Sequence, residues 1–278
     1  MSRTPRGGGR TGEPPPAPEP LAVPALDSHC HLDLLDVGVD ETTAAAKAVG
    51  IARVVTVGVD AATSRWSVET ARTHPDVFAA VAIHPNDAPR APSADLDEIE
   101  RLAADPAVVA VGETGLDYFR TGDDGRPAQE ESFRRHIDIA KRSGKALMIH
   151  DRDAHLDVLR VLDAEGAPEH VVLHCFSGDA DFARACIERG YVLSFAGTVT
   201  FASAQPLREA AAITPLGQLL VETDAPFLTP HPYRGRPNAP YLVPLTVRAV
   251  AAAIGTSPDV VAAAVTATAA RVFAWTDC

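Results

Sequence analysis

The stretch VPALDSHCHLD, residues 23–33, joins a short apolar run to a pair of histidines. Val23–Asp27 is typical of a buried strand, and His29 and His31 follow it two positions apart. Residues two apart on an extended chain point to the same face, so both imidazoles can reach one metal ion. Cys30 points the other way and is not a ligand candidate. The stretch therefore predicts a strand that leads into a metal site.

The same unit, a short apolar run followed by a longer amphipathic segment, recurs along the whole chain. The predicted strands are Val23–Asp27, Arg53–Val57, Val77–Ile83, Val108–Gly112, Ala146–Ile149, Val171–Leu173, Tyr191–Phe195 and Leu219–Glu222. Helices are predicted at Glu41–Val49, Ser64–His74, Asp95–Ala104, Glu130–Ser143, Ala154–Ala164, Ala180–Arg189, Ser203–Ile213, Val243–Ile254 and Ser257–Trp275. Strands that alternate with helices in this way predict a TIM-like (β/α)₈ barrel, as a single domain over residues 23–278. Residues 1–22, rich in Gly, Pro and Arg, are expected to form a disordered tail.

Composition narrows the class of protein. The chain has 46% hydrophobic and 22% charged residues, which is the ordinary globular range. No apolar stretch reaches the roughly 20 residues of a membrane span, and the N-terminus lacks a secretory signal, so we expect a cytoplasmic monomer that does not bind membranes. The four cysteines show no CxxC spacing, which argues against a disulfide framework and a zinc knuckle. The net charge of −12 excludes broad electrostatic capture of nucleic acid, so any polyanionic substrate must be bound locally.

Further ligand-type side chains lie near the ends of the fourth, fifth, sixth and eighth predicted strands. In a barrel these ends meet at one mouth, where the catalytic groups gather. With the histidine pair they make six candidate metal ligands: His29, His31, Glu113, His150, His174 and Asp224. Mixed imidazole and carboxylate ligands without thiolate suit Zn, Mn, Fe or Co, and Mg where carboxylates dominate.

Two metal ions a few ångströms apart need a bridging anion, which in many barrel hydrolases is a carboxylated lysine. The three lysines, Lys47, Lys141 and Lys145, are all placed away from the mouth, which leaves Glu113 as the natural bridge. We therefore expect two divalent cations, Mg, Mn, Zn or Co, with Glu113 and Asp224 as the catalytic residues. The ions would activate a water for in-line displacement, and Asp224 would take its proton.

Five longer motifs contain these residues: DSHCHLD (Asp27–Asp33), GETGLDY (Gly112–Tyr118), MIHDRDA (Met148–Ala154), LHCFSGD (Leu173–Asp179) and VETDAPFLTP (Val221–Pro230). With RGRPNAPYLVP after the last strand, the chain closely resembles the TatD family of metal-dependent deoxyribonucleases, within the amidohydrolase superfamily, over about residues 25–275. The resemblance implies a TIM-like barrel and a two-metal site built from the six candidates. It also implies phosphodiester hydrolysis with 3′–5′ exonuclease action on single-stranded DNA, which would bind at the barrel mouth.

The resemblance further implies that His84 and Arg152 contact substrate phosphate, and it makes Arg234 in the closing loop a substrate-binding candidate. The chemistry fits, since a donor or a cation close to the metals suits a phosphate. The alternatives are structural. His84 could be a capping or core histidine, and Arg152 could form an ion pair with one of three nearby aspartates: Asp151, Asp153 or Asp179.

Other functions stay open at this point. An amidohydrolase acting on a small cyclic amide, ester or lactone would use the same metal architecture, because it activates water for attack on a carbonyl too. A narrow neutral pocket would favour that enzyme, and positive charge at the mouth would favour the nuclease. A non-catalytic barrel would normally have lost a ligand, and all six are present. Asp151 replaces a small hydroxyl residue common in the family, which leaves the substrate open.

Overall fold

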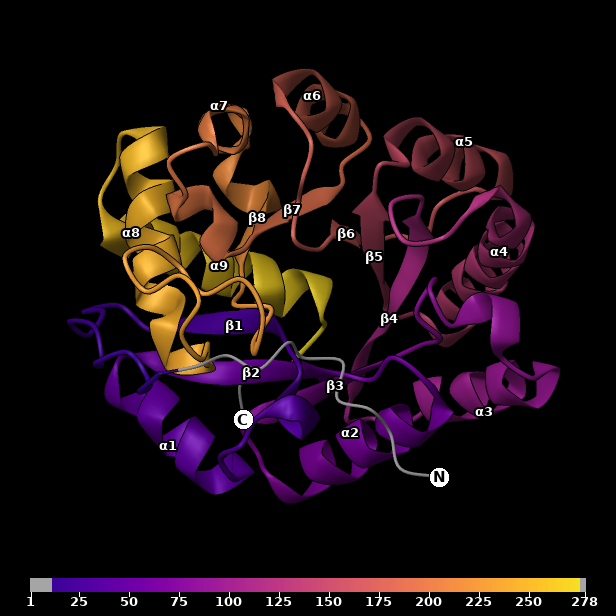
Figure 1. The fold of residues 1–278 in the computed structure, drawn as a ribbon, viewed down its shortest axis with the longest axis horizontal. Helices are drawn as coiled ribbons and strands as arrows, with labels where there is room; N and C mark the ends of the chain where they lie inside the picture. Colours follow the sequence, from indigo (N-terminus) through magenta and orange to yellow (C-terminus); the bar gives the residue numbers. More distant parts are fainter. Residues whose placement is uncertain (1–11, 276–278) are drawn as a thin grey trace.

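The computed structural model describes residues 12–275 and places eight parallel strands in a single sheet, hydrogen-bonded in sequence order (Figure 1). The strands are β1 Ala25–Cys30, β2 Ile51–Val57, β3 Val77–Val81, β4 Val108–Asp117, β5 Ala146–Arg152, β6 Val171–Leu173, β7 Val192–Phe195 and β8 Leu219–Val221. A parallel bridge between Cys30 and Ala225 joins the end of β1 to the segment that follows β8. The sheet therefore curves into the predicted TIM-like barrel.

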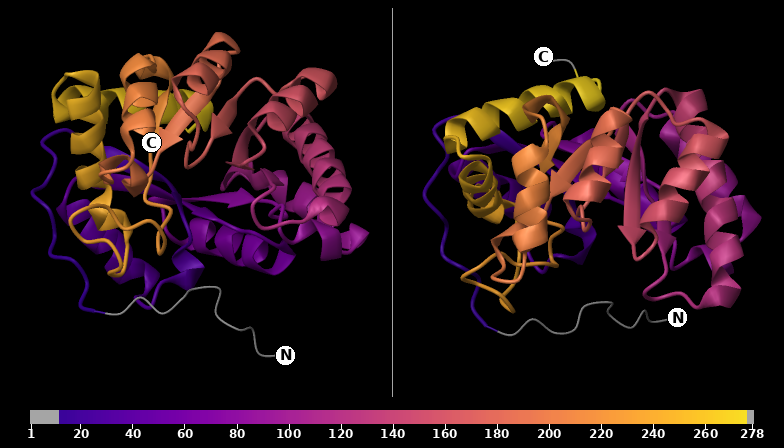
Figure 2. Two further views of the ribbon diagram at one scale, coloured as in Figure 1. Left: turned by 45° about the horizontal axis from the view of Figure 1, so that its top comes forward. Right: turned by 90° about the horizontal axis from the view of Figure 1, so that it is seen from above.

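Helices lie around the outside of this sheet (Figures 1 and 2). They are α1 Val39–Ala48, α2 Ala61–Thr73, α3 Ser93–Ala103, α4 Arg126–Ser143, α5 His155–Glu165, α6 Ala180–Glu188, α7 Gln205–Ile213, α8 Val243–Ile254 and α9 Pro258–Val272. Local sequence sets several of the helix ends. Asp60 caps α2 by accepting a hydrogen bond from the backbone N–H of Thr63, and Gly144 ends α4 in the left-handed conformation.

The hydrophobic core forms because both faces of the sheet are covered. Val and Ala make nearly continuous buried runs in β3 and in the first half of β4, as expected for parallel strands between helices and a filled barrel interior. No single helix within residues 12–275 is long and apolar enough to cross a membrane. The segments Pro240–Ile254 and Pro258–Val272 pass that test only as a pair bent by 107°.

Three strands extend beyond their predicted ends, and each extension carries a candidate ligand. β1 was expected to end at Asp27, β4 at Gly112 and β5 at Ile149, whereas the structure places His29, Glu113 and His150 within these strands. The register of β4 against β5 shifts between Val111 and Thr114, after which pairing resumes. Gly115 makes this possible, because it has φ +133° and a Cβ there would lie 2.1 Å from the backbone oxygen of His150.

The segment expected to be a disordered tail is partly packed against the barrel. Residues 1–11 lie outside the described residues. Residues 13–21, here called the N-terminal strap, run beside α8 (Figure 2). Three side chains donate hydrogen bonds to its carbonyl oxygens: Arg236 to Glu13 and Pro14, Tyr241 to Pro15, and Arg248 to Glu19 and Pro20. The donors come from distant parts of the chain, so the local composition on which the expectation of a disordered tail was based does not reveal these contacts.

Candidate metal centre

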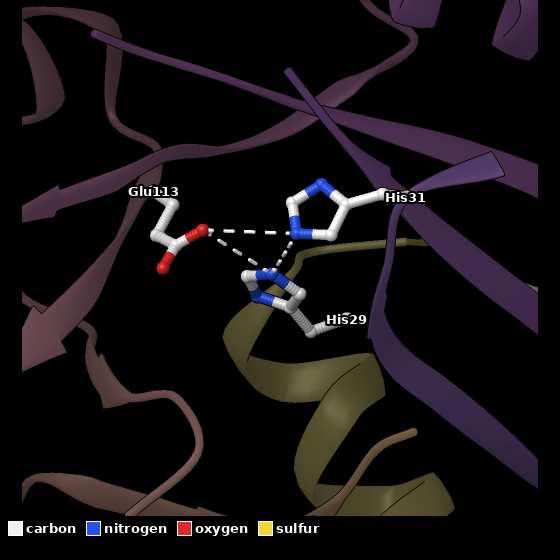
Figure 3. Close-up of side chains that lie close together, drawn as sticks. All are labelled: His29, His31 and Glu113. Atoms are coloured by element: carbon white, nitrogen blue, oxygen red, sulfur yellow. Dashed lines mark hydrogen bonds and ion pairs between the residues drawn. The ribbon is translucent and has the colours of Figure 1, made fainter. Parts of the chain in front are cut away.

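Four side chains meet at the carboxyl end of the barrel around one point (Figure 3 shows three of them). The Nε2 atoms of His29 and His31 lie 3.4 Å apart. Oε2 of Glu113 lies 3.6 Å and 3.8 Å from these two nitrogens. Oδ1 of Asp224 lies 3.7 Å and 3.5 Å from them.

These separations match a metal site better than a hydrogen-bonded cluster. Nitrogen–oxygen hydrogen bonds cluster at about 2.7–3.2 Å. Two ligand atoms about 2.1 Å from one cation, at a tetrahedral angle, are instead about 3.4 Å apart. The donor set of two imidazoles and two carboxylates therefore fits a single divalent cation between them.

The other oxygen of Glu113 faces a different group of histidines. Oε1 lies 2.7 Å from Nδ1 of His150 and 2.8 Å from Nε2 of His174. Nε2 of His84 lies 3.4 Å from the same oxygen. One carboxylate thus has one oxygen toward each histidine pair, an arrangement that suits a carboxylate shared by two cations.

Each of the four histidines among the candidate ligands also has a partner for its second ring nitrogen. The pairs are His29 with Met148 Sδ (3.2 Å), His31 with the carbonyl of Val57 (3.1 Å), His150 with Asp117 (3.2 Å) and His174 with Glu222 (3.1 Å). Such partners fix the tautomer and the orientation of a metal-binding imidazole. Each ring therefore has one nitrogen free to face the candidate metal centre formed by the six predicted ligands, here called the centre.

Glu222 is a functional candidate that the sequence reasoning missed. It is fully buried, and it lies close enough to His29 and His174 to form a possible ligand group with them. Its oxygens are already used, however. Oε1 accepts a hydrogen bond from the backbone N–H of Cys175 (2.8 Å) as well as facing His174, and Oε2 accepts one from Ser194 (2.6 Å). Glu222 therefore orients His174 and is not placed as a ligand.

Asp117 and Asp27 were missed in the same way. Asp117 faces His150 and accepts hydrogen bonds from the Asn86 side chain (2.9 Å) and the Arg120 backbone (2.8 Å). Asp27 accepts hydrogen bonds from the backbone N–H groups of Thr223 (2.9 Å) and His29 (3.3 Å), and burial raises its pKa to about 8. Asp27 lies in the motif DSHCHLD and Asp117 in the motif GETGLDY. Their place in these motifs is the sequence signal that could have identified them.

The electrostatics of the cluster keep its carboxylates charged. Burial alone would raise the pKa of Glu113, but the neighbouring His174 and His84 and the hydrogen bonds from His150 and His174 hold it well below its usual range. The pKa of Asp224 is lowered as well: burial alone would raise it, but the interaction with His31 and the nearby charges of His29 and His174 together outweigh burial. Ionised carboxylates are the form that binds a cation.

The structure separates the substrate-binding candidates into two groups. His84 belongs to the centre, with its ring 4.7 Å from that of His150 and its Nδ1 accepting a hydrogen bond from the backbone N–H of Asn86 (3.0 Å). Arg152 and Arg234 instead lie over aromatic rings, 3.8 Å from Phe119 and 4.1 Å from Phe201.

Neither guanidinium, within residues 12–275, has a carboxylate at ion-pair distance or forms a hydrogen bond with one of the six candidate ligands. The alternative of an ion pair between Arg152 and a nearby aspartate is therefore not seen. The carboxylate of Asp151 faces His155 at 2.7 Å instead.

Comparison with known proteins gives four consistent matches: a family model, two relatives and a solved structure. Residues 26–274 match the family model described as TatD related DNase. A Mycobacterium tuberculosis protein named uncharacterized metal-dependent hydrolase TatD is 50% identical over 256 residues, covering 89% of this chain and 97% of its own. A Salmonella typhimurium protein named 3′-5′ ssDNA/RNA exonuclease TatD is 32% identical over 241 residues, covering 84% and 92%. The crystal structure of YJJV, a TatD homologue from Escherichia coli, has a TM-score of 0.85 at 27% identity and covers 91% of this chain and 98% of its own.

Proposed function

The chain belongs to the TatD-related DNase family and is a metal-dependent hydrolase, and on this basis we propose that it removes nucleotides from the 3′ end of single-stranded DNA. The observation that carries the proposal is Glu113, whose two oxygens face His29 and His31 on one side and His150 and His174 on the other. With Asp224, these residues would hold two divalent cations, Mg, Mn, Zn or Co. When bound, such ions supply an activated water and stabilise charge on a phosphate.

The chain's own groups have separate tasks in this proposal. Asp224, ionised and beside His31, accepts the proton of the attacking water. His84 reaches the centre next to Glu113 and is placed to donate to a phosphate oxygen. Asp117 and Glu222 hold the rings of His150 and His174 in position.

The free arginines favour a phosphodiester over a small neutral substrate. Arg152 and Arg234 have no carboxylate partner within the described chain, in a protein whose formal net charge is −12. A guanidinium binds phosphate with two parallel hydrogen bonds. A lactone or cyclic amide carries no charge that would use these groups.

The test is hydrolysis of single-stranded DNA labelled at its 3′ end. Metal-stripped protein is resupplied in turn with Mg, Mn, Co or Zn, and the Glu113→Ala variant is the control. We expect at least one metal to restore label release by the wild type, with loss of about a hundredfold or more in the variant because its histidine pairs no longer share a carboxylate. If no metal restores cleavage while a small ester or lactone is hydrolysed, the phosphodiester proposal is wrong.

A further inference from the structure

Phe119 is an aromatic side chain that the fold leaves exposed beside the centre. It follows β4 by two residues and is 63% exposed. The other large hydrophobic side chains exposed within residues 12–275 are all aliphatic: Leu34, Val37, Leu156, Ile213, Leu216 and Val260. The backbone N–H of Tyr118 donates to the carbonyl of Arg152 (2.9 Å), which fixes the start of this loop against β5. Phe119 therefore projects from an anchored segment.

Arg152 covers one face of the Phe119 ring and leaves the rest of the residue in solvent. The guanidinium carbon lies 3.8 Å from the ring centroid. Because Arg152 has no carboxylate partner among the described residues, its donors remain available to an anion. Contact with the ring also restricts the Arg152 side chain, so less rotamer freedom is lost when it binds an anion.

The Phe119–Arg152 pair is connected to the centre through β4 and β5. His150 and Arg152 are two apart on β5 and so share one face of the strand. Asp117, two residues before Phe119, faces the ring of His150 at 3.2 Å and pairs with Arg152 across the two strands. A strand of nucleic acid whose phosphate lies at the centre would meet Phe119 and Arg152 within the next nucleotide.

We propose that Phe119 and Arg152 form a nucleotide platform, in which a base of a single strand stacks on the Phe119 ring while Arg152 binds the adjacent phosphate. This inference rests on the proposed function and assigns the choice of single-stranded substrate to these two residues. Every base has an aromatic face, so stacking is tolerant of sequence, and a duplex keeps its bases stacked internally. The platform therefore selects single strands without selecting a sequence.

A similar stack occurs across the mouth, where Arg234 lies 4.1 Å from the ring of Phe201. Phe201 follows β7, and Arg234 lies in the loop after β8. The ring of Phe201 is only partly exposed, so the platform is assigned to Phe119.

The experiment compares two strands of equal length and charge, oligo(dT) and a strand of abasic residues that keeps every phosphate. Phe119→Ala should lower kcat/KM on oligo(dT) about tenfold or more, mainly through KM, and leave the abasic strand unaffected. Phe119→Trp should retain the wild-type preference. Ile213→Ala, an exposed aliphatic position at the end of α7, is the matched control and should change neither rate. Equal losses on both strands, or no loss on either, overturn the platform.

A binding measurement distinguishes failure of the nucleotide platform from failure of the nuclease proposal. If the wild type releases no nucleotide with any metal, fluorescence anisotropy of both labelled strands is measured in the same metal solutions. Tighter binding of oligo(dT) that Phe119→Ala abolishes keeps the platform and rejects only hydrolysis. Equal binding of the two strands by the wild type rejects the platform.

Discussion

At the scale of single residues, the contact between Glu222 and His174 determines how one imidazole faces the centre. Nδ1 of His174 lies 3.1 Å from Oε1 of Glu222, which leaves Nε2 directed at Glu113. Ser194 and the backbone of Cys175 hold the carboxylate from its remaining sides. Removing the carboxylate would free the ring to rotate and leave buried donors without an acceptor.

Glu222→Ala should therefore weaken metal binding. Loss of a carboxylate that orients a histidine ligand costs about 10- to 100-fold in metal affinity, and isothermal titration of metal-stripped protein with Mn or Zn measures it. Glu222→Gln is the isosteric control. Its oxygen can still accept from His174 and Cys175 while its amide donates to Ser194, so the loss should be smaller. Unchanged affinity in Glu222→Ala would show that Glu222 has no part in the centre.

The residues that meet at the centre were largely foreseen, whereas their supporting partners were not. Histidines and carboxylates near strand ends must converge if the strands form a barrel, so one fold prediction places all six candidates. Glu222 and Asp117 escaped because their roles depend on how the strand ends pack: Asp117 meets His150 of the adjacent strand β5, and Glu222, after β8, meets His174, after β6. Phe119 escaped because exposure of an aromatic side chain is a property of the folded chain.

At the scale of elements, His136 joins α4 to the segment after β3. Its Nε2 accepts a hydrogen bond from the backbone N–H of Ile83 (3.0 Å), and its Nδ1 lies 2.6 Å from the carbonyl of Ser132. The side chain is fully buried, and burial lowers its pKa to about 4. The fold therefore accommodates the neutral ring. Because Ile83 immediately precedes His84, the contact connects α4 to the centre.

This contact predicts a loss of stability in mild acid. The unfolded chain binds a proton at His136 below its ordinary pKa of 6.5, while the folded chain resists protonation until about pH 4. Stability contributed by His136 is therefore complete above pH 6.5 and is lost as the pH falls from 6.5 toward 4, by about 2 kcal/mol at pH 5.

His136→Gln keeps a neutral acceptor and lacks this titration. Urea unfolding at pH 7 and pH 5 should show the free energy of unfolding of the wild type falling more than that of the variant, by about this amount. A pH dependence that is the same in both proteins would contradict the assignment.

The helices and strands could be predicted from the alternation of apolar runs with amphipathic segments. The predicted β6 and α8 have the bounds that the structure shows. β4 does not, because Gly112 and Gly115 look like the end of a strand in sequence, since glycine is typical of turns. In the fold these glycines allow β4 to continue close to β5, where a Cβ at Gly112 would lie 2.4 Å from that of Met148.

At the scale of the whole molecule, the candidate ligands connect β1, β4 and β5 with the segments that follow β6 and β8. A cation that binds only the folded chain stabilises it by about 2.7 kcal/mol when free metal is a hundredfold above Kd. For a chain of this size that corresponds to a rise in Tm of about 5–10 °C.

Removing metal should therefore lower the melting temperature. Differential scanning calorimetry with EDTA, and again after excess Mn, Zn, Co or Mg is restored, measures the shift. Glu113→Ala should show a much smaller shift with the same metals. A wild-type Tm that no chelator or metal moves would contradict binding at this centre.

Charge distribution is a second property of the whole molecule. Many arginines on the outer helices are paired with carboxylates, as Arg160 is with Glu130 and Asp157, and Arg189 with Asp163. The composition predicted that a polyanion would have to be bound locally. Which arginines remain available could not be predicted, because pairing across neighbouring helices depends on their packing.

The N-terminal strap has a consequence for how this chain can vary over evolution. Its hydrogen bonds to Arg236, Tyr241 and Arg248 all end on main-chain carbonyl oxygens, which every amino acid provides. Exchanging one strap residue for another leaves these acceptors in place, whereas inserting or deleting a residue shifts all those beyond it out of register. Selection should therefore tolerate drift in the identity of the exposed strap residues, constrain the buried Pro15 and Leu21, and act against changes in the number of strap residues.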